Sequence, residues 1–250
     1  MNHQTALTET IGVMKNHASV RQYTSDPIPK EHLLEIILAG QSAASSHFVQ
    51  AYSIIHVTDK EKKDKMAELS KNQHVSGCSD FFLFCADMKR LEYAGKKNGV
   101  TIEHDGVENF ITAIVDVGLI AQNVITAAES LGYGGCYIGG VRNNPGPIGE
   151  LAGLPDKVFP VFGLCLGVPA VRNEVKPRLP LEAILHENVY NEQQYPELLE
   201  RYDQTMAEYY QRRSSNNKNI NWTEGVADFL KNKRRVHMRE YVASKGFHLP

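Results

Sequence analysis

The stretch VENFITAIVDVGLIAQNVITAAESL, residues 107–131, decides the fold of this chain. If it forms a helix, apolar residues occupy nearly every side of it, and little polar face remains for solvent. A helix of this kind is buried in a large core or in a subunit interface. Gly132 follows at the position where a left-handed residue commonly ends a helix. The stretch therefore predicts a long buried helix on which other elements pack.

Segments typical of strands and helices alternate on both sides of this helix. The run FFLFCAD at 81–87 is continuously apolar, as in a strand covered on both faces. We predict an α+β fold, with a central mixed β-sheet flanked by helices and a buried long helix. The further strands are expected at 51–58, 134–141 and 158–168, and the shorter helices at 5–16, after Asp26–Pro29, after Asp59 and near 147–152.

The last part of the sequence is helical. Helices are expected at about 195–212 and 223–245, with the polar loop RRSSNNKN at 212–219 between them. We therefore predict one domain over residues 1–250, with a helical C-terminal excursion at about 190–250.

The composition excludes several classes of protein. The chain has 250 residues, of which 42% are hydrophobic and 22% charged, within the ordinary range of soluble domains. Its formal net charge of -2 argues against general nucleic-acid binding. No apolar leader is visible, and no stretch approaches the roughly 20 apolar residues of a membrane span. We expect a cytoplasmic protein that binds neither membranes nor nucleic acid.

Four cysteines are present, and none form a C-x-x-C pair. Three of them lie in strongly apolar surroundings, which is typical of reduced core thiols. We expect neither a metal site nor a disulfide framework. The four are Cys78, Cys85, Cys136 and Cys165.

The segment HASVR at 17–21 alternates groups that bind anions. If it is extended, His17, Ser19 and Arg21 point the same way. An imidazole and a hydroxyl suit a phosphate, and a guanidinium suits a phosphate or the electron-rich edge of a ring. A polar turn after a helix would give the same pattern, so the segment alone leaves both interpretations open.

The segment KPRLP at 176–180 places two cations on a stiff backbone. Lys176 and Arg178 flank one proline, and another proline follows. Fixed cations suit a fixed anion, although an exposed basic loop would look the same.

The segment YIGGVRN at 137–143 carries paired glycines at the end of an expected strand. Glycines there let backbone amides approach a ligand closely. A dinucleotide fingerprint does not fit, because Tyr137 stands at the third glycine position counted from Gly132. The hydroxyl-rich segment at 42–50 is uninformative by itself.

Together these segments resemble the FMN-dependent nitroreductase family, in particular its NADPH-dependent flavin reductases and oxygen-insensitive nitroreductases of type A. The resemblance spans nearly the whole chain. It rests on phrases that follow one another in the family's order: H-x-S-x-R at 17–21, a serine-rich segment before Phe48, FCAD at 84–87, AAESLG at 127–132, YIGG-x-RN at 137–143, FGLCLG at 162–167, KPRLP at 176–180, HEN at 186–188, and SNN with Trp222 shortly after.

The resemblance implies a bound FMN and assigns residues to its phosphate and its ring. Arg21 matches the cation beside the pyrimidine edge of the flavin. The residues that match phosphate-binding positions are His17, Ser19, Lys176 and Arg178.

The resemblance also implies a homodimer whose second subunit contributes to the FMN site. Ser45 and Ser46 match positions that reach FMN from that second subunit, and Gln73 matches a glutamine beside the flavin or its ribityl chain. The strand whose backbone faces flavin N5 is matched by Tyr137, Gly139 and Gly140.

NADPH is the electron donor that the resemblance implies, with NADH less favoured. The basic residues that match positions around NADPH are Arg142, Arg213, Lys231 and Arg234. Two residues depart from the family pattern. Ala18 stands where relatives often carry arginine, and His47 stands where they often carry a third serine.

We therefore expect an FMN-dependent oxidoreductase that passes electrons from NADPH to nitroaromatics, quinones or free flavin by a ping-pong mechanism. FMN would carry the chemistry, tuned by Arg21, with no protein nucleophile and no metal. Two alternatives remain open, a non-turnover flavoprotein that stores or senses FMN and a flavin-free protein that binds a nucleotide in a basic pocket. Bound FMN that NADPH rapidly bleaches would exclude both.

Overall fold

The computed structural model describes residues 7–213 and 217–248. The chain divides into two compact units, Met1–Asn173 with Arg235–Pro250, and Glu174–Arg234. The single domain with an excursion at about 190–250 stays a prediction. The second unit begins earlier than that excursion, and the last residues return to the first unit.

The first unit is built on a four-stranded sheet with the order β1-β2-β4-β3. Its strands are β1 (Tyr52–Val57), β2 (Asp80–Asp87), β3 (Gly134–Ile138) and β4 (Val158–Gly167). All three pairings between these described strands are antiparallel, which corrects the expected mixed pairing. An apolar run shows that both faces of a strand are covered, but helices can cover both faces of an antiparallel sheet as well.

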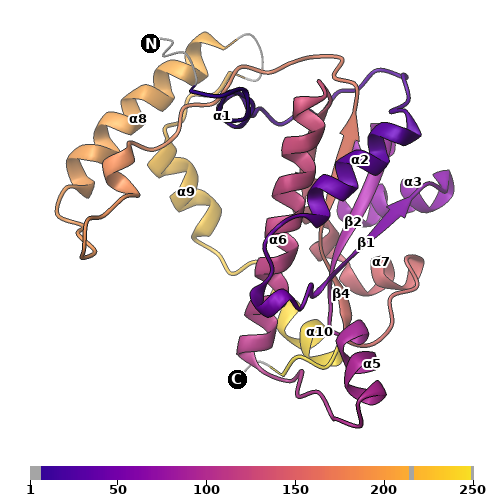
Figure 1. Cartoon of the computed structure of the whole chain (residues 1–250). Helices are drawn as coiled ribbons and strands as arrows, with labels where there is room; N and C mark the ends of the chain where they lie inside the picture. The colour runs from indigo at the N-terminus through magenta and orange to yellow at the C-terminus, as the bar shows by residue number, and fades with distance from the viewer. Residues whose placement is uncertain (1–6, 214–216, 249–250) are drawn as a thin grey trace. The chain divides into compact units, whose positions relative to one another are not determined.

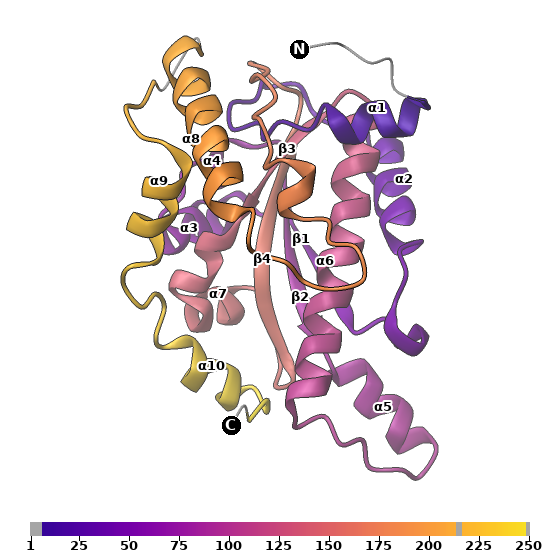
Figure 2. The ribbon, with the colours of Figure 1, turned by 90° about the vertical axis from the view of Figure 1, so that its left-hand side faces the viewer.

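One face of the sheet packs against two helices. Phe82 and Phe84 of β2 belong to a core that also contains buried residues of α2 (Lys30–Gln41) and α6 (Val107–Ser130). Figures 1 and 2 show α2 and α6 side by side on this face. The expected α+β architecture, with a long buried helix against a sheet, is confirmed.

The other face packs against shorter helices. Phe81 and Leu83, which alternate with the phenylalanines of the first face, lie in a second core. That core is closed by α3 (Lys60–Ser70), α4 (His74–Gly77) and α7 (Pro145–Leu151), which Figure 2 shows across the sheet from α6. All four cysteines are buried, as expected of core thiols.

The long buried helix expected at residues 107–131 is confirmed as α6. Eight of its residues are buried, and Gly132 follows its end with a φ of 86°. By length and composition α6 could also cross a membrane, which corrects the expectation that no stretch came near a span. Core helices pass the same test. One stripe of α6 stays exposed and apolar, at Val107, Ile111, Val115 and Leu119.

Three further helices complete the first unit: α1 (Glu9–Lys15), α5 (Lys89–Lys97) and α10 (Met238–Ser244). The helix expected at 223–245 is two helices, because the chain breaks at 231–237, where Arg235 is left-handed. After α10, Phe247 is fully buried in the first core.

The second unit is a small helical assembly. Its helices are α8 (Tyr195–Arg212) and α9 (Trp222–Leu230), and they are tied by Asp203 of α8. The Asp203 carboxylate accepts hydrogen bonds of 2.9 Å from the backbone amides of Trp222 and Thr223, at the start of α9. The buried core of the unit consists of Tyr202, Met206 and Tyr209.

Candidate functional site

The segment 17–21 lies alongside strand β3 in the first unit. The amide of Val20 donates a hydrogen bond of 2.9 Å to the carbonyl of Gly135, and the Val20 side chain is buried. Its neighbours Ser19 and Arg21 are more exposed. The alternation expected from the sequence is therefore present: one apolar side chain points inward and the polar ones flank it.

His17 is held by an acidic residue of α6. Its Nδ1 lies 2.6 Å from Oε1 of Glu129, whose side chain is 13% exposed. An ionised carboxylate only accepts hydrogen bonds, so Nδ1 must carry the hydrogen, which directs Nε2 away from Glu129. We expected His17 from the sequence but missed Glu129, which lies within the AAESLG phrase that supported the resemblance.

Arg21 lies beside the thiol of Cys136 on β3. Burial raises the pKa of this thiol, and the Arg21 guanidinium partly offsets the rise. The guanidinium itself is at the surface. The fold thus brings Arg21 to the same strand that leads into Tyr137, although the two are far apart in sequence.

Tyr137 uses its side chain inside the fold. Its hydroxyl donates a hydrogen bond of 2.7 Å to the carbonyl of Ala121 on α6, and its ring packs edge-on against Phe162. Burial raises the pKa of Tyr137 above its ordinary value, so the phenol stays neutral. What Tyr137 can offer a ligand is therefore its backbone.

Gly139 and Gly140, the two glycines after β3, differ in how much space the fold leaves for a side chain. They open the turn η2 (Gly139–Asn143). A Cβ at Gly140 would lie 2.3 Å from the carbonyl oxygen of Ser70, so the fold itself demands glycine there. A Cβ at Gly139 would lie 3.4 Å from the flexible end of Arg142. Of the two, Gly139 is the position that its own fold leaves open for a ligand.

Arg142 is engaged by its own chain. Its guanidinium donates to the carbonyl of Val161, and its own carbonyl accepts a hydrogen bond of 2.9 Å from His237. Burial, and then the nearby Arg235, lower the pKa of the guanidinium. This geometry fits a structural role at the end of the sheet, and the assignment of Arg142 to NADPH stays a prediction.

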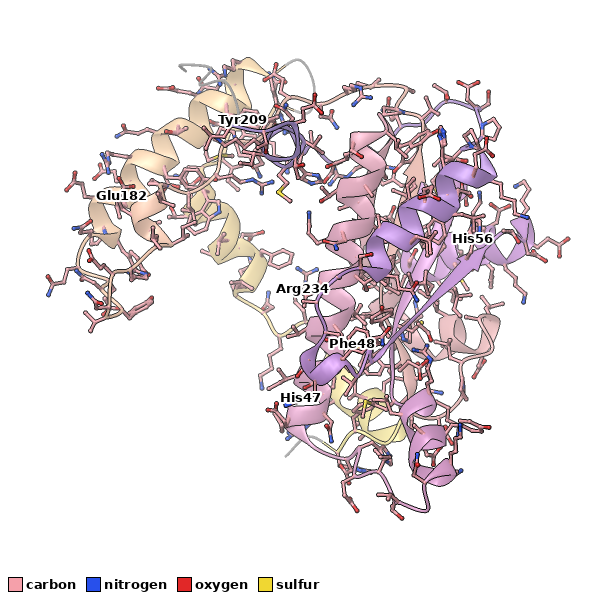
Figure 3. The ribbon with its side chains drawn as sticks, viewed as in Figure 1. His47, Phe48, His56, Glu182, Tyr209 and Arg234 are labelled. Carbon is pink, nitrogen blue, oxygen red and sulfur yellow. The ribbon has the colours of Figure 1, made fainter. Side chains whose placement is uncertain are left out.

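The loop between α2 and β1 holds the serines. It contains the turn η1 (Ser46–Phe48) and three non-glycine residues with positive φ, His47, Phe48 and Gln50. Each such backbone conformation costs about 1 kcal/mol or more of folding free energy, which contacts with the surrounding structure must offset. Figure 3 shows His47 and Phe48 on this loop, and both are exposed. Gln73 is exposed immediately before α4.

The second unit carries the stiff pair of cations. Lys176 and Arg178 are both exposed. Between them, the carbonyl of Pro177 accepts a hydrogen bond of 2.9 Å from the hydroxyl of Tyr202 on α8. The middle of the KPRLP segment is therefore fixed to a buried residue while its two cations stay at the surface.

Arg213 and Lys176 both form cation–π contacts with the ring of Tyr210. The Lys176 Nζ lies 5.3 Å and the Arg213 guanidinium 4.8 Å from the ring centre of Tyr210. The Nε of Arg213 is buried and has no hydrogen-bond partner in the described ranges. An orphaned buried donor in a cationic cluster is what an anionic ligand would satisfy.

The remaining two basic residues lie at the far end of this unit. Lys231 is exposed and forms an ion pair of 2.6 Å with Asp228. The guanidinium of Arg234 stacks over the ring of Phe229 at 3.7 Å. Neither is brought to Tyr210 by a described contact, and their roles toward NADPH stay predictions.

Each of the two units contains several of the residues that were predicted for the site. The first brings Arg21 to β3 and fixes His17 on α6, and the second clusters Lys176 and Arg213 around Tyr210. Cations, hydroxyls and a close-approach glycine are the donor set that a flavin with a phosphate tail requires. The residues present therefore fit FMN.

The fold is that of an α+β protein with a four-stranded sheet and a long buried helix. The family model described as "Nitroreductase family" matches residues 14–168, and "Nitroreductase family, C-terminal domain" matches residues 176–250. The chain belongs to the nitroreductase family. It is an NAD(P)H-dependent oxidoreductase.

Known relatives cover almost the whole chain. A Pseudomonas sp. protein named "CR(VI) reductase" is 56% identical over 94% of this chain and 97% of its own length. The "FMN reductase (NADPH)" of Bacillus subtilis is 38% identical over 96% of this chain and 99% of its own. The solved structure of NfrA1 from Bacillus megaterium has a TM-score of 0.93 at 39% identity, covering 96% of this chain and 100% of its own.

Proposed function

We propose that this protein binds FMN and passes electrons from NADPH to small acceptors such as nitroaromatics, quinones or free flavin. The observation that carries the proposal is the segment 17–21, laid against β3 by the bond from Val20 to Gly135, with Arg21 at the strand that leads to Gly139. FMN, when bound, accepts a hydride from the nicotinamide and gives its electrons to the acceptor.

The residues of this chain bind and tune the flavin. Ser19 and Nε2 of His17 would hold the phosphate, since Nδ1 of His17 is already occupied by Glu129. In the second unit, Lys176 and Arg178 are the two fixed cations that would suit a phosphate. Arg21 would supply a permanent positive charge at the pyrimidine edge, where negative charge develops during reduction. A backbone amide near Gly139 would face N5.

NADPH would be distinguished from NADH by its 2′-phosphate. Arg213 is our candidate for this phosphate, because its Nε is a buried donor without a partner in the part of the chain that the structure describes. A guanidinium matches phosphate oxygens with its planar fork. Donor and acceptor would occupy the same face of the flavin in turn, which gives ping-pong kinetics.

We also propose a homodimer, in agreement with the exposed stripe of α6. Val107, Ile111, Val115 and Leu119 are each 41% to 50% exposed and follow one another at intervals of four residues, on one side of the helix. A contiguous apolar surface of this kind is typical of an interface. The protein would act as a cytoplasmic enzyme.

Chromate is a second candidate acceptor. The relative at 56% identity carries the name "CR(VI) reductase". The other relatives named above are less similar, so chromate belongs in any comparison of acceptors, beside a nitroaromatic, a quinone and free FMN.

Anaerobic titration of the purified yellow protein with NADPH, and then with NADH, tests the proposal. We expect one equivalent of NADPH to bleach the flavin absorbance rapidly and NADH to do so more slowly. Bound flavin that NADPH fails to reduce would indicate a storage or sensing protein instead. A colourless protein that gains no chromophore with added FMN would reject flavin binding altogether.

A further inference from the structure

The loop 45–51 is held in a conformation that its own residues do not favour. His47, Phe48 and Gln50 have φ values of 45°, 58° and 51°. L-amino acids with side chains rarely adopt such angles, and none of these three is a glycine. Contacts from outside the loop must therefore hold it in place.

Asp116 of α6 makes three of those contacts with one buried carboxylate, and Arg90 adds a hydrogen bond of 3.2 Å to the carbonyl of Gln50. The Asp116 side chain is in the core, with an exposed fraction of 1% for the residue. One carboxylate oxygen accepts hydrogen bonds from the Ser45 hydroxyl at 2.7 Å and the Ala51 amide at 3.0 Å. The other oxygen accepts the Ser46 amide at 3.2 Å. Both ends of the loop are thus tied to the same residue.

The hydroxyl of Ser45 is fully engaged as a donor. It gives its single hydrogen to Asp116 and accepts a hydrogen bond of 2.7 Å from the amide of Gln50. A phosphate or carbonyl oxygen needs a donor, and Ser45 has no second hydrogen to offer. The exposed Ser46 hydroxyl, in contrast, forms no hydrogen bond within residues 7–213 and 217–248.

We propose that Asp116 is a positioning residue that holds this loop so that Ser46 and His47 reach the flavin of a second copy, and that Ser45 acts through Asp116. The inference rests on the proposed function, because it presupposes FMN in a dimer. It changes the expected role of Ser45 from a flavin contact to an anchor behind the contact. The buried carboxylate of Asp116 then stabilises the unfavourable backbone conformation at the tip of the loop.

The first experiment measures the FMN dissociation constant of the dimer by flavin fluorescence for Ser45→Ala, Asp116→Asn and the double variant. Each single variant should weaken FMN binding about tenfold, in line with the loss of a hydrogen bond to a charged group. The double variant should be no weaker than the worse single variant, because both remove the same interaction. Effects that multiply to about 100-fold would mean that Ser45 touches the flavin itself, and would overturn the proposal.

Matched variants separate positioning from contact. Ser45→Thr keeps the hydroxyl and should restore FMN affinity. Ser46→Ala should weaken binding by a factor that multiplies with the effect of Ser45→Ala, because Ser46 acts independently. Ser42→Ala, which removes a nearby hydroxyl bonded only to its own helix at Leu38, should change nothing. If Ser45→Ala bound FMN normally while Ser42→Ala bound it more weakly, the assignment of Ser45 as the anchor would be contradicted.

The second experiment needs no flavin. Amide hydrogen exchange of the flavin-stripped protein should accelerate at Ser46 and Ala51 in both Ser45→Ala and Asp116→Asn, and not in Ser46→Ala. Unchanged exchange in folded Ser45→Ala would overturn the anchor, and this variant decides the matter even if Asp116→Asn does not fold. A native protein that binds no FMN would reject the proposed function, whereas normal FMN binding by Ser45→Ala would reject this inference alone.

Discussion

The turn after β3 and the segment 17–21 both adjoin β3, yet they use their polar side chains in opposite ways. Around the turn, the side chains point inward: the hydroxyl of Tyr137, near the end of β3, bonds to Ala121, and the Arg142 guanidinium in the turn bonds to Val161. In the segment 17–21, Arg21 stays at the surface and His17 keeps one ring nitrogen away from Glu129. The turn should therefore govern stability and the segment should govern binding.

The largest effect should come from the turn, at Gly140→Ala. The added Cβ would meet the carbonyl of Ser70 at 2.3 Å, a contact with backbone that cannot move aside easily. We expect the free energy of unfolding to fall by about 3 kcal/mol, measured by chemical denaturation. Gly139→Ala meets only the end of Arg142 at 3.4 Å and is the matched control. Equal losses in the two variants would break the comparison.

Arg21→Ala should show the reverse pattern. We expect kcat/KM with NADPH to fall about 100-fold, because a fixed charge at the developing negative charge is lost. The free energy of unfolding should change by less than about 0.5 kcal/mol, since the side chain is exposed. Arg21→Lys keeps the charge and should lose less activity. A large loss of stability with unchanged kcat/KM would show that Arg21 belongs to the fold.

Arg142→Met tests whether this arginine serves the fold or NADPH. Without the guanidinium, the carbonyl of Val161 loses its partner, and stability should fall by about 2 kcal/mol. The KM for NADPH should stay near that of the native protein, measured by initial rates at saturating acceptor. A raised KM for NADPH in an Arg142→Met variant of unchanged stability would show that Arg142 contributes to NADPH binding.

Arg213→Ala is the counterpart in the second unit. We expect the KM for NADPH to rise about tenfold and the KM for NADH to change little, because only NADPH carries the 2′-phosphate. Initial rates with both donors give the answer. Arg212→Ala, which removes the exposed cation of the preceding residue, is the control. Equal rises for the two donors would remove Arg213 from phosphate recognition.

The smallest effect should come from Glu129→Gln. The amide can still occupy the position of the carboxylate, but it no longer presents a charge to Nδ1 of His17. We expect FMN to bind about fivefold more weakly, as judged by fluorescence titration, with little loss of stability, because one hydrogen bond to His17 is weakened. His17→Ala should make the Glu129→Gln substitution silent. An effect of Glu129→Gln that persists without His17 would show that the glutamate acts by another route.

The sequence predicted elements well where the pattern was local. The expected helix at 107–131 is α6 at Val107–Ser130, where eight residues of the long apolar run are buried against the core. The helix expected after Asp59 is α3, and Asp59 caps it by accepting a hydrogen bond from the amide of Lys62. The direction of strand pairing was wrong, since an apolar run says only that both faces of a strand are covered.

The individual site residues stay predictions, and the buried residues that support them could not be predicted from the sequence. Asp116 and Glu129 contact residues 71 and 112 positions away, and no local pattern joins such pairs. An acid in the middle of an apolar helix is the signal that could have pointed to Asp116, because a buried carboxylate must find donors somewhere. The 231–237 break between α9 and α10 was missed because helix propensity alone does not reveal a left-handed residue such as Arg235.

The exposed stripe of α6 bears on how the protein unfolds. The helix that organises the core has one side, at Val107, Ile111, Val115 and Leu119, left without cover by the described residues of its own chain. If a second copy covers that side, each protomer holds only part of its hydrophobic core until it associates. Thermal melting should then be a bimolecular event, with a midpoint that climbs as the protein is concentrated.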